Sequence, residues 1–176
     1  MKPFMTEKGI LSLLESIAQT IQQDYQTKQQ PPLMLGIRTG GVWIAEHLHE
    51  MMELPDPLGI LDISLYRDDF SQKGINTRAK PSHIPFNMDH RDIILVDDVI
   101  LTGRTIRAAM NEIFDYARPA SVKLAVLVER DGREVPIQAD YSGIHTVLQM
   151  DQKMRLIGGD EPLTLLIKST KDGDNQ

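Results

Sequence analysis

The chain has 176 residues, the usual size of one domain, and its 41% hydrophobic and 25% charged residues are ordinary for a globular protein. No stretch approaches the ~18 apolar residues of a membrane helix, and residues 1–10 lack the features of a secretory signal. The net charge of −6 argues against a dedicated nucleic-acid binder, because phosphate neutralisation dominates such affinity. The lack of cysteine excludes disulfides, thiolate catalysis and Cys-ligated metals, and favours a cytoplasmic protein.

The first part of the chain predicts one long helix, then a strand, a second helix and another strand. Apolar residues recur at helical spacing after Thr6, the predicted N-cap, at Ile10, Leu14, Ile17, Ala18, Ile21 and Tyr25. Two prolines end this stretch, and residues 33–37 (LMLGI) indicate a short buried strand. The turn RTGG leads into a helix over residues 42–53, and the alternation in residues 60–66 predicts a strand.

The second part begins with residues 67–91, which are mostly polar and show no helix or strand pattern. A segment of that kind inside a compact domain is usually functional. Residues 92–99 (DIILVDDV) indicate a buried strand, and a third helix is predicted from about Thr105 to Tyr116. Further strands are predicted over residues 122–129, 144–148 and 163–167. We expect residues 1–170 to form a single domain and residues 171–176 to be a disordered tail.

Strands that alternate with helices predict an α/β fold with a mainly parallel sheet. In such sheets ligands bind beyond the carboxyl ends of the strands. Arg38, Asp97 and Arg130 each follow or end a predicted strand, so all three are expected at that edge. The chemistry of the protein is therefore expected there.

The run IILVDDVILTGRT, residues 93–105, carries the strongest functional pattern. Asp97 and Asp98 follow four branched apolar residues, and two carboxylates are costly to bury unpaired. The TGRT turn precedes a helix, whose first amides and dipole favour a phosphate group. Carboxylates suit vicinal hydroxyls, so the run as a whole predicts a sugar-phosphate site. TGRT alone would be read as a helix cap beside two solvated aspartates.

The segment GIRTGG, residues 36–41, is a second turn from a strand into a helix. Alone it reads as a plain tight turn, but beside the first loop it offers a second anion site. That site would consist of Arg38, Thr39 and the amides of Gly40 and Gly41. The five histidines are scattered, so a histidine metal site is not expected. Any metal would be Mg²⁺ held mainly by the phosphates of the substrate.

Residues 93–105 resemble the PRPP-binding signature of type I phosphoribosyltransferases, in which apolar residues precede two acidic residues and then Thr-Gly-Arg/Lys-Thr. The segments DISLYRDDFS, IPF, LAVLVERDGRE and ADYSG stand in the order found in the PyrR family. Members of that family are pyrimidine operon attenuators that also act as uracil phosphoribosyltransferases. The resemblance covers about residues 33–145. It implies a type I phosphoribosyltransferase fold, with a mainly parallel twisted sheet flanked by helices, a flexible lid loop and a small hood.

The resemblance also implies roles for individual residues. Asp97 and Asp98 would bind the ribose hydroxyls of PRPP, the turn after them the 5′-phosphate, and the loop at Thr39 the pyrophosphate. The lid would span residues 71–84, with Arg78 or Lys80 supplying positive charge. The implied catalytic residues are Asp97, Asp98 and Arg78, and the implied substrate-binding residues are Arg38, Thr39, Gly40, Gly41, Asp97, Asp98, Ile100, Leu101, Thr102, Gly103, Arg104, Thr105, Arg130 and Tyr141. Tyr141 would stack on the base, unless it is a half-buried surface tyrosine.

The implied reaction is the displacement of pyrophosphate from PRPP by uracil, with Mg²⁺, which yields UMP. A purine-base phosphoribosyltransferase is an alternative, because the PRPP signature does not specify the base. The chain departs from the family at Gly40, where an arginine is usual. It also has Gln138 and Ile144 where RNA-binding relatives often have Arg and Lys, so an RNA-binding attenuator ranks below the transferase. The resemblance implies a homodimer or a larger homo-oligomer.

Overall fold

The computed structural model describes residues 2–63, 81–149 and 151–169. The predictions for Arg78, Lys80, most of the lid at residues 71–84 and the tail at residues 171–176 lie outside this range. The helices are α1 (Glu7–Tyr25), α2 (Gly40–Met51) and α4 (Arg104–Tyr116). The strands are β1 (Lys2–Met5), β2 (Leu33–Ile37), β3 (Gly59–Leu61), β4 (Asp92–Ile100), β5 (Ser121–Arg130), β6 (Tyr141–Thr146), β7 (Gln152–Ile157) and β8 (Thr164–Ser169).

The main sheet has the strand order β3-β2-β4-β5-β6, and every neighbouring pair is parallel. Gly36 of β2 pairs with Val96 of β4, and Val96 pairs with Ala125 of β5. This register brings the carboxyl ends of β2, β4 and β5 to the same edge. The predicted α/β architecture is therefore confirmed.

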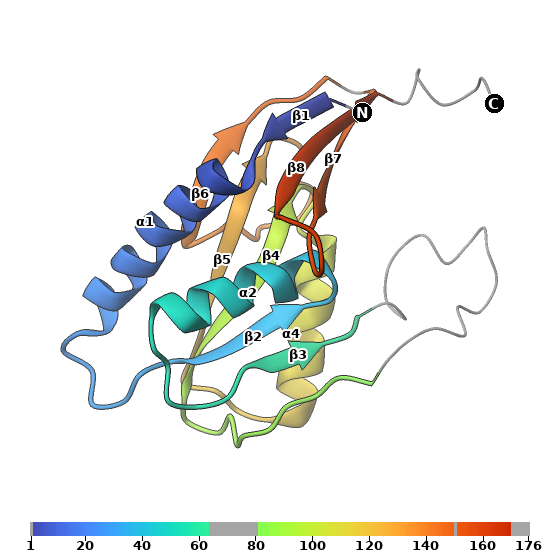
Figure 1. Ribbon diagram of the computed structural model, residues 1–176. Coiled ribbons are helices and arrows are strands. Elements are labelled where there is room, and N and C mark those ends of the chain that lie inside the picture. Colours follow the sequence, from blue (N-terminus) through green and yellow to red (C-terminus); the bar gives the residue numbers. More distant parts are fainter. Residues whose placement is uncertain (1, 64–80, 150, 170–176) are drawn as a thin grey trace.

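Helices cover both faces of this sheet, with α1 and α2 on one side and α4 on the other (Figure 1). Side chains of β4 pack against the helices on both faces of the sheet, because successive side chains point to opposite faces of a strand. Ile94 and Val96 pack toward α1 and α2, whereas Ile93 and Leu95 pack toward α4. All four side chains are fully buried. Burial on both faces explains the unbroken apolar run that precedes the aspartates.

A second, three-stranded antiparallel sheet has the order β1-β8-β7 and corresponds to the predicted hood (Figure 1). Leu156, Leu163 and Leu165 of this part pack into the core beside α1. The turn at Gly158 lies against the ring of Trp43 in the first turns of α2. The hood is thus fixed next to the start of α2.

Several predicted bounds shift in the structure. Helix α2 begins at Gly40 rather than at residue 42, and β6 begins at Tyr141 rather than at residue 144. Strands β1 and β7 were not predicted from the sequence at all. Thr6 does occupy the N-cap position of α1, although its side chain makes no capping hydrogen bond. The earlier start of α2 matters most, because it turns the RTGG segment into the N-terminus of a helix.

Candidate active site

The two aspartates of β4 lie at the carboxyl edge, where they were expected. The side chain of Asp97 is buried, with 4% of its surface exposed, and its Oδ1 accepts a hydrogen bond of 2.9 Å from the amide of Asp98. The carboxylate of Asp98 is half-buried and accepts a bond of 3.0 Å from the amide of Val99. These local bonds orient both carboxylates and offset part of the cost of burying them.

Gly40 and Gly41 bring the RTGG turn into direct contact with the aspartates. A Cβ on Gly40 would collide with the carboxylate of Asp98. A Cβ on Gly41 would lie 2.5 Å from the backbone oxygen of Val96 and 2.9 Å from the Cα of Asp97. A side chain at position 41 would meet backbone atoms, so this position requires glycine, whereas a side chain at position 40 would displace the carboxylate of Asp98. The two loops that the sequence suggested separately form one site.

Arg38 and Thr39 complete this turn at the start of α2. Thr39 is the N-cap and makes no side-chain capping bond, and the peptide bond between Arg38 and Thr39 is cis. The guanidinium of Arg38 lies 3.6 Å from Asp62, measured from Nε to Oδ2. The first amides of a helix have no partner within it, so the turn offers N–H donors beside a cationic side chain.

The TGRT loop forms a tight cap on α4. Gly103 has φ +84°, a left-handed conformation that favours glycine. The hydroxyl of Thr102 accepts a hydrogen bond of 3.2 Å from the amide of Arg104, and the side chain of Arg104 pairs with Glu134 at 2.7 Å. Amides of Glu134 and Val135 both donate to the carbonyl of Thr102. The loop is therefore braced from behind, and Thr105 follows in the first turn of the helix.

Ile100, Leu101 and Arg130 flank the loop. Ile100 is buried, whereas Leu101 is 37% exposed and contacts Gly132. Arg130, the last residue of β5, donates a bond of 3.3 Å from its Nη2 to the carbonyl of Gln152 in β7. Burial lowers the pKa of the Arg130 guanidinium. Arg130 thus lies at the predicted edge and ties the main sheet to the hood.

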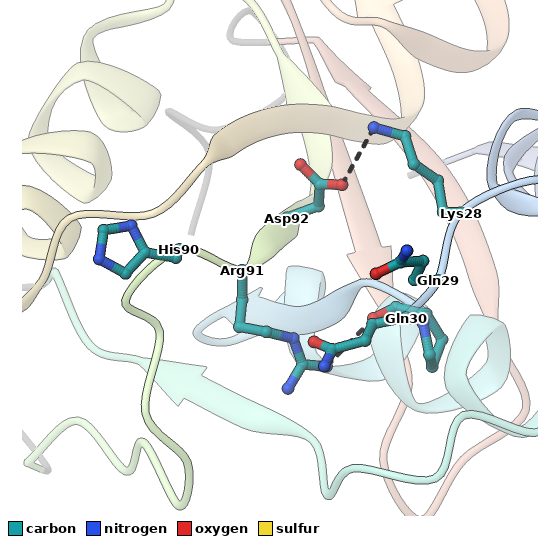
Figure 2. Close-up of a pocket in the computed structure, with 7 residues that line it drawn as sticks. Lys28, Gln29, Gln30, His90, Arg91 and Asp92 are labelled. Atoms are coloured by element: carbon teal, nitrogen blue, oxygen red, sulfur yellow. Dashed lines mark hydrogen bonds and ion pairs between the residues drawn. The ribbon is translucent and has the colours of Figure 1, made fainter.

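The amino edge of the sheet carries a separate pocket of about 280 Å³ (Figure 2). It is lined by Lys28, Gln29, Gln30, Pro31, His90, Arg91 and Asp92. Lys28 pairs with Asp92 at 3.5 Å, and Arg91 pairs with Asp56 at 2.8 Å. Its lysine and arginine are each matched by a carboxylate, and it lies at the end of the strands opposite to Asp97. It is not part of the candidate site.

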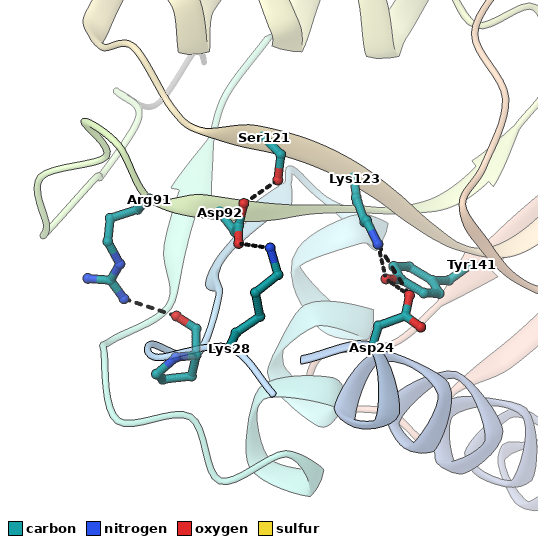
Figure 3. A network of polar contacts seen from close by, with 8 residues as sticks. Asp24, Lys28, Arg91, Asp92, Ser121, Lys123 and Tyr141 are labelled. Carbon is teal, nitrogen blue, oxygen red and sulfur yellow. Dashed lines mark hydrogen bonds and ion pairs between the residues drawn. The ribbon is translucent and has the colours of Figure 1, made fainter. Parts of the chain in front are cut away.

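Tyr141 points toward Asp24 and Lys123, in a network that lies near Asp92 at the amino edge (Figure 3). Its side chain is 5% exposed, and its hydroxyl donates to Asp24 at 2.7 Å and accepts from Lys123 at 3.1 Å. Lys123 also lies over the rings of Tyr141 and Tyr25. The structure therefore does not bring Tyr141 to the position expected for a residue that stacks on the base. Nothing in ADYSG revealed that Asp24, far away in the sequence, would bind its hydroxyl.

The sequence did not predict a role for three further residues, Asp62, Ser82 and Glu112. Asp62 follows β3 and pairs with Arg38, Ser82 donates to Glu112 at 2.5 Å, and the amide of Asp62 donates to Ser82 at 2.9 Å. Each of these residues reads as an ordinary polar residue in the sequence. Their contacts join residues 20 to 30 positions apart, which a local pattern does not reveal.

The described residues contain no cluster of three or more His, Cys, Asp or Glu side chains suited to hold a metal ion. Mg²⁺ usually takes one or two protein carboxylates together with substrate phosphates. The half-buried carboxylate of Asp98 beside the RTGG turn fits that type of shared site. Among the described residues, none of the helices is long and apolar enough to cross a membrane.

Comparison with known proteins agrees with this geometry. Residues 6–158 match the family model described as "Phosphoribosyl transferase domain". The "Bifunctional protein PyrR" of Nitrosococcus oceani is 50% identical over 163 residues, which cover 91% of this chain and 92% of that protein. The chain belongs to the PyrR family of phosphoribosyltransferases. The "Bifunctional protein PyrR" of Pseudomonas aeruginosa PAO1 is 49% identical over 127 residues, covering 72% of this chain and 75% of its relative.

Solved structures support the same fold. A hypoxanthine phosphoribosyltransferase of Trypanosoma cruzi superimposes with a TM-score of 0.73 at 20% identity, and the match covers 97% of this chain and 92% of that chain. Another structure of that enzyme gives a TM-score of 0.72 at 22% identity, over 96% of this chain and 97% of the other. At this level of identity the likeness concerns the fold alone. The type I phosphoribosyltransferase fold expected from the sequence is confirmed, and enzymes with this domain are pentosyltransferases.

Proposed function

We propose that this member of the PyrR family is a uracil phosphoribosyltransferase, which converts uracil and PRPP into UMP and pyrophosphate. The observation that carries the proposal is the contact between the two loops: the carboxylate of Asp98 packs against Gly40, and Gly41 packs against Asp97. A carboxylate pair, a helix N-terminus and a cationic turn thus meet at one edge. Those are the groups that a phosphorylated ribose carrying a pyrophosphate requires.

Each part of PRPP has a partner in this arrangement. The 5′-phosphate would bind at the start of α4, where the turn 102–105 supplies amide donors and the helix dipole favours an anion. The ribose hydroxyls would donate to Asp97 and Asp98, whose carboxylates are acceptors only. The pyrophosphate would bind at the start of α2, beside Arg38. Mg²⁺, when bound, would neutralise charge on the pyrophosphate.

In the proposed reaction, N1 of uracil forms a bond to C1 of the ribose, while the bond from C1 to the pyrophosphate oxygen breaks. The electron pair of the broken bond leaves with pyrophosphate, and the N1 proton of uracil passes to solvent. No side chain acts as a nucleophile. The protein holds the two reactants in line and stabilises the charge that grows on the leaving group.

Gly40 stands where the family usually has arginine. Another arginine lies close to this position in the structure. Arg38, two residues earlier, lies at the same turn with its guanidinium fixed by Asp62. We propose that Arg38 provides the positive charge that Gly40 lacks. A cytoplasmic location and assembly into homodimers or larger homo-oligomers belong to the same proposal.

The experiment that tests this function is an assay with PRPP, Mg²⁺ and one base at a time, in which the nucleotide products are followed. Product from uracil alone supports the proposal. Product from hypoxanthine or guanine alone overturns it in favour of a purine-base enzyme.

Regulation by RNA is a second candidate, because two of the similar proteins are named "Bifunctional protein PyrR". The charges around residues 130–145 favour it less. The charge of the nearby Arg104 is paired with Glu134, whereas Arg133 donates only to the neutral Gln138 and keeps its positive charge. Fewer unpaired cations mean fewer phosphate contacts and a flatter salt dependence. Failure of a pyrimidine-operon leader RNA to bind at low salt would remove this second role.

A further inference from the structure

Arg38 and Asp62 are held side by side by the pairing of two strands. Each is the first residue after its strand, since β2 ends at Ile37 and β3 at Leu61, and these two residues are paired in register. The amide of Arg38 donates a hydrogen bond of 2.9 Å to the carbonyl of Leu61. The two backbones are therefore fixed before any contact between side chains forms.

The side chains then meet in a largely buried environment. The side chain of Asp62 is only 6% exposed and that of Arg38 is 26% exposed, with Nε and Oδ2 3.6 Å apart. That separation suits an ion pair but exceeds a normal hydrogen bond. The Nε of Arg38 is buried and has no hydrogen-bond partner among the described residues. Coulombic attraction to Asp62 therefore offsets part of the cost of burying this nitrogen.

Asp62 is itself anchored to the helix that starts with the TGRT loop. Its amide donates to the hydroxyl of Ser82 at 2.9 Å, and that hydroxyl donates to Oε1 of Glu112 in α4. Next to Ser82, His83 forms two backbone bonds of 2.8 Å with Ile60 of β3. A continuous chain of contacts therefore runs from α4 through Ser82 and Asp62 to the guanidinium at the other loop.

We propose that Asp62 is a positioning residue that holds the guanidinium of Arg38 against the pyrophosphate of PRPP. This inference rests on the proposed function, because it requires pyrophosphate at the turn that contains Gly40. Gly40 has no side chain with which to provide charge, so the orientation of Arg38 decides how strongly the turn attracts an anion. An arginine that is held in one orientation loses less entropy on binding than a mobile one.

Asp62 could also weaken the binding of PRPP, and the direction of the change in Asp62→Asn distinguishes the two effects. A carboxylate next to Arg38 also reduces the local positive charge. If neutralisation dominated, Asp62→Asn would tighten the binding of PRPP. If positioning dominates, the same substitution weakens it.

The test is a kinetic comparison of Asp62→Asn, Asp62→Glu, Arg38→Gln and the double variant Arg38→Gln/Asp62→Asn. We expect Asp62→Asn to raise KM for PRPP by about tenfold, as the loss of a contact to a charged group does, while KM for uracil stays the same. Asp62→Glu recovers part of the loss because it restores the charge. In the Arg38→Gln background, Asp62→Asn has no further effect, because the two residues act through one contact.

Two measurements separate positioning from general damage to the fold. Asp56→Asn is the control, since it removes another Asp–Arg pair, with an arginine of similar exposure, at the amino edge far from the turn, and we expect it to leave the kinetics unchanged. Trp43, the single tryptophan, lies on α2 just after the turn, so we would follow the binding of magnesium pyrophosphate by its fluorescence. We expect Asp62→Asn to weaken this binding in parallel with KM, and Ser82→Ala to weaken it less.

If the Asp62→Asn protein is active but its KM for PRPP is unchanged or lower, the positioning role is overturned. The proposed function is not affected by that result. Additive effects of Arg38→Gln and Asp62→Asn overturn the positioning role as well. A wild-type protein that forms no UMP refutes the proposed function, and the role of Asp62 falls with it. Thermal unfolding of each variant shows that the protein assayed is folded.

Discussion

The carboxylate of Asp98 packs directly against the Cα of Gly40, so that any side chain at position 40 would displace it. This contact joins the end of β4 to the first turn of α2, two parts of the chain that are more than fifty residues apart. The proposed ribose site and the proposed pyrophosphate site are therefore in direct contact. A change in one loop is expected to alter the other.

Gly41→Ala should destabilise the protein. The added methyl group would lie 2.5 Å from the carbonyl oxygen of Val96, and the backbone of a central strand does not yield easily. Overpacking costs about 1–3 kcal/mol, whereas replacing a helical glycine with alanine stabilises by about 1 kcal/mol. The contact with a backbone atom places the cost at the upper end of that range, so we expect a net loss of about 2 kcal/mol in the free energy of unfolding, measured by urea denaturation. Asn111→Ala on the exposed side of α4 is the control, and an equal or more stable Gly41→Ala protein would contradict the packing described.

Gly103→Ala should also destabilise the protein, for two separable reasons. An alanine at φ +84° costs about 1–2 kcal/mol in backbone strain, and its Cβ would lie 2.7 Å from Cγ2 of Val135. The additional substitution Val135→Ala removes the collision but leaves the strain. In a double-mutant cycle, Gly103→Ala should therefore cost less in the Val135→Ala background. Simple additivity of the two free energies would show that the side chain of Val135 does not restrict the space beside Gly103.

Tyr141→Phe should affect stability and not the use of uracil. Removal of the hydroxyl breaks its hydrogen bonds to Asp24 and Lys123, which should cost about 1 kcal/mol. KM for uracil should stay unchanged, because the ring lies away from the candidate site. A rise in KM for uracil without loss of stability would restore the original expectation of base stacking.

The same hydroxyl predicts a dependence of stability on alkaline pH. Burial, and then the bond to Asp24, raise the pKa of Tyr141 from 10.0 to about 12. The folded state thus favours the protonated hydroxyl, so its contribution is present below pH 10 and is lost as the pH rises toward 12. Between pH 10 and pH 12, the free energy of unfolding, measured by denaturation at each pH, should fall more steeply for the wild-type protein than for Tyr141→Phe. Parallel curves would mean that Tyr141 does not titrate with unfolding.

The sequence predicted the parts of the fold in which local pattern and burial agree. Strand β4 could be recognised because it is buried on both faces and therefore continuously apolar, and Gly103 marked the loop that follows. Strand β7 could not, because it lies on the small sheet with Lys153 and Arg155 exposed and a single buried residue, Leu156. A half-exposed strand of that kind has no apolar run to reveal it.

For the site, the sequence predicted which loops matter but not how they touch. The aspartates and both turns lie at the expected edge, since parallel strands place their carboxyl ends together. The collision of a side chain at Gly40 with Asp98 and the pairing of Arg38 with Asp62 depend on tertiary register. Tyr141 shows the converse, because a motif position alone gave no information about the direction of its side chain.

The most direct test of the central claim is the rate of UMP formation from uracil, PRPP and Mg²⁺ by the wild-type protein, Asp97→Asn, Asp98→Asn and the control Asp56→Asn. Loss of one preorganised charged group at such a site is worth about 3 kcal/mol in the barrier, or roughly a hundredfold in rate. We predict that the wild-type and Asp56→Asn proteins form UMP at equal rates and that both active-site variants are slower by about that factor. Undiminished turnover by Asp97→Asn and Asp98→Asn, or no UMP from the wild-type protein, would contradict the assignment.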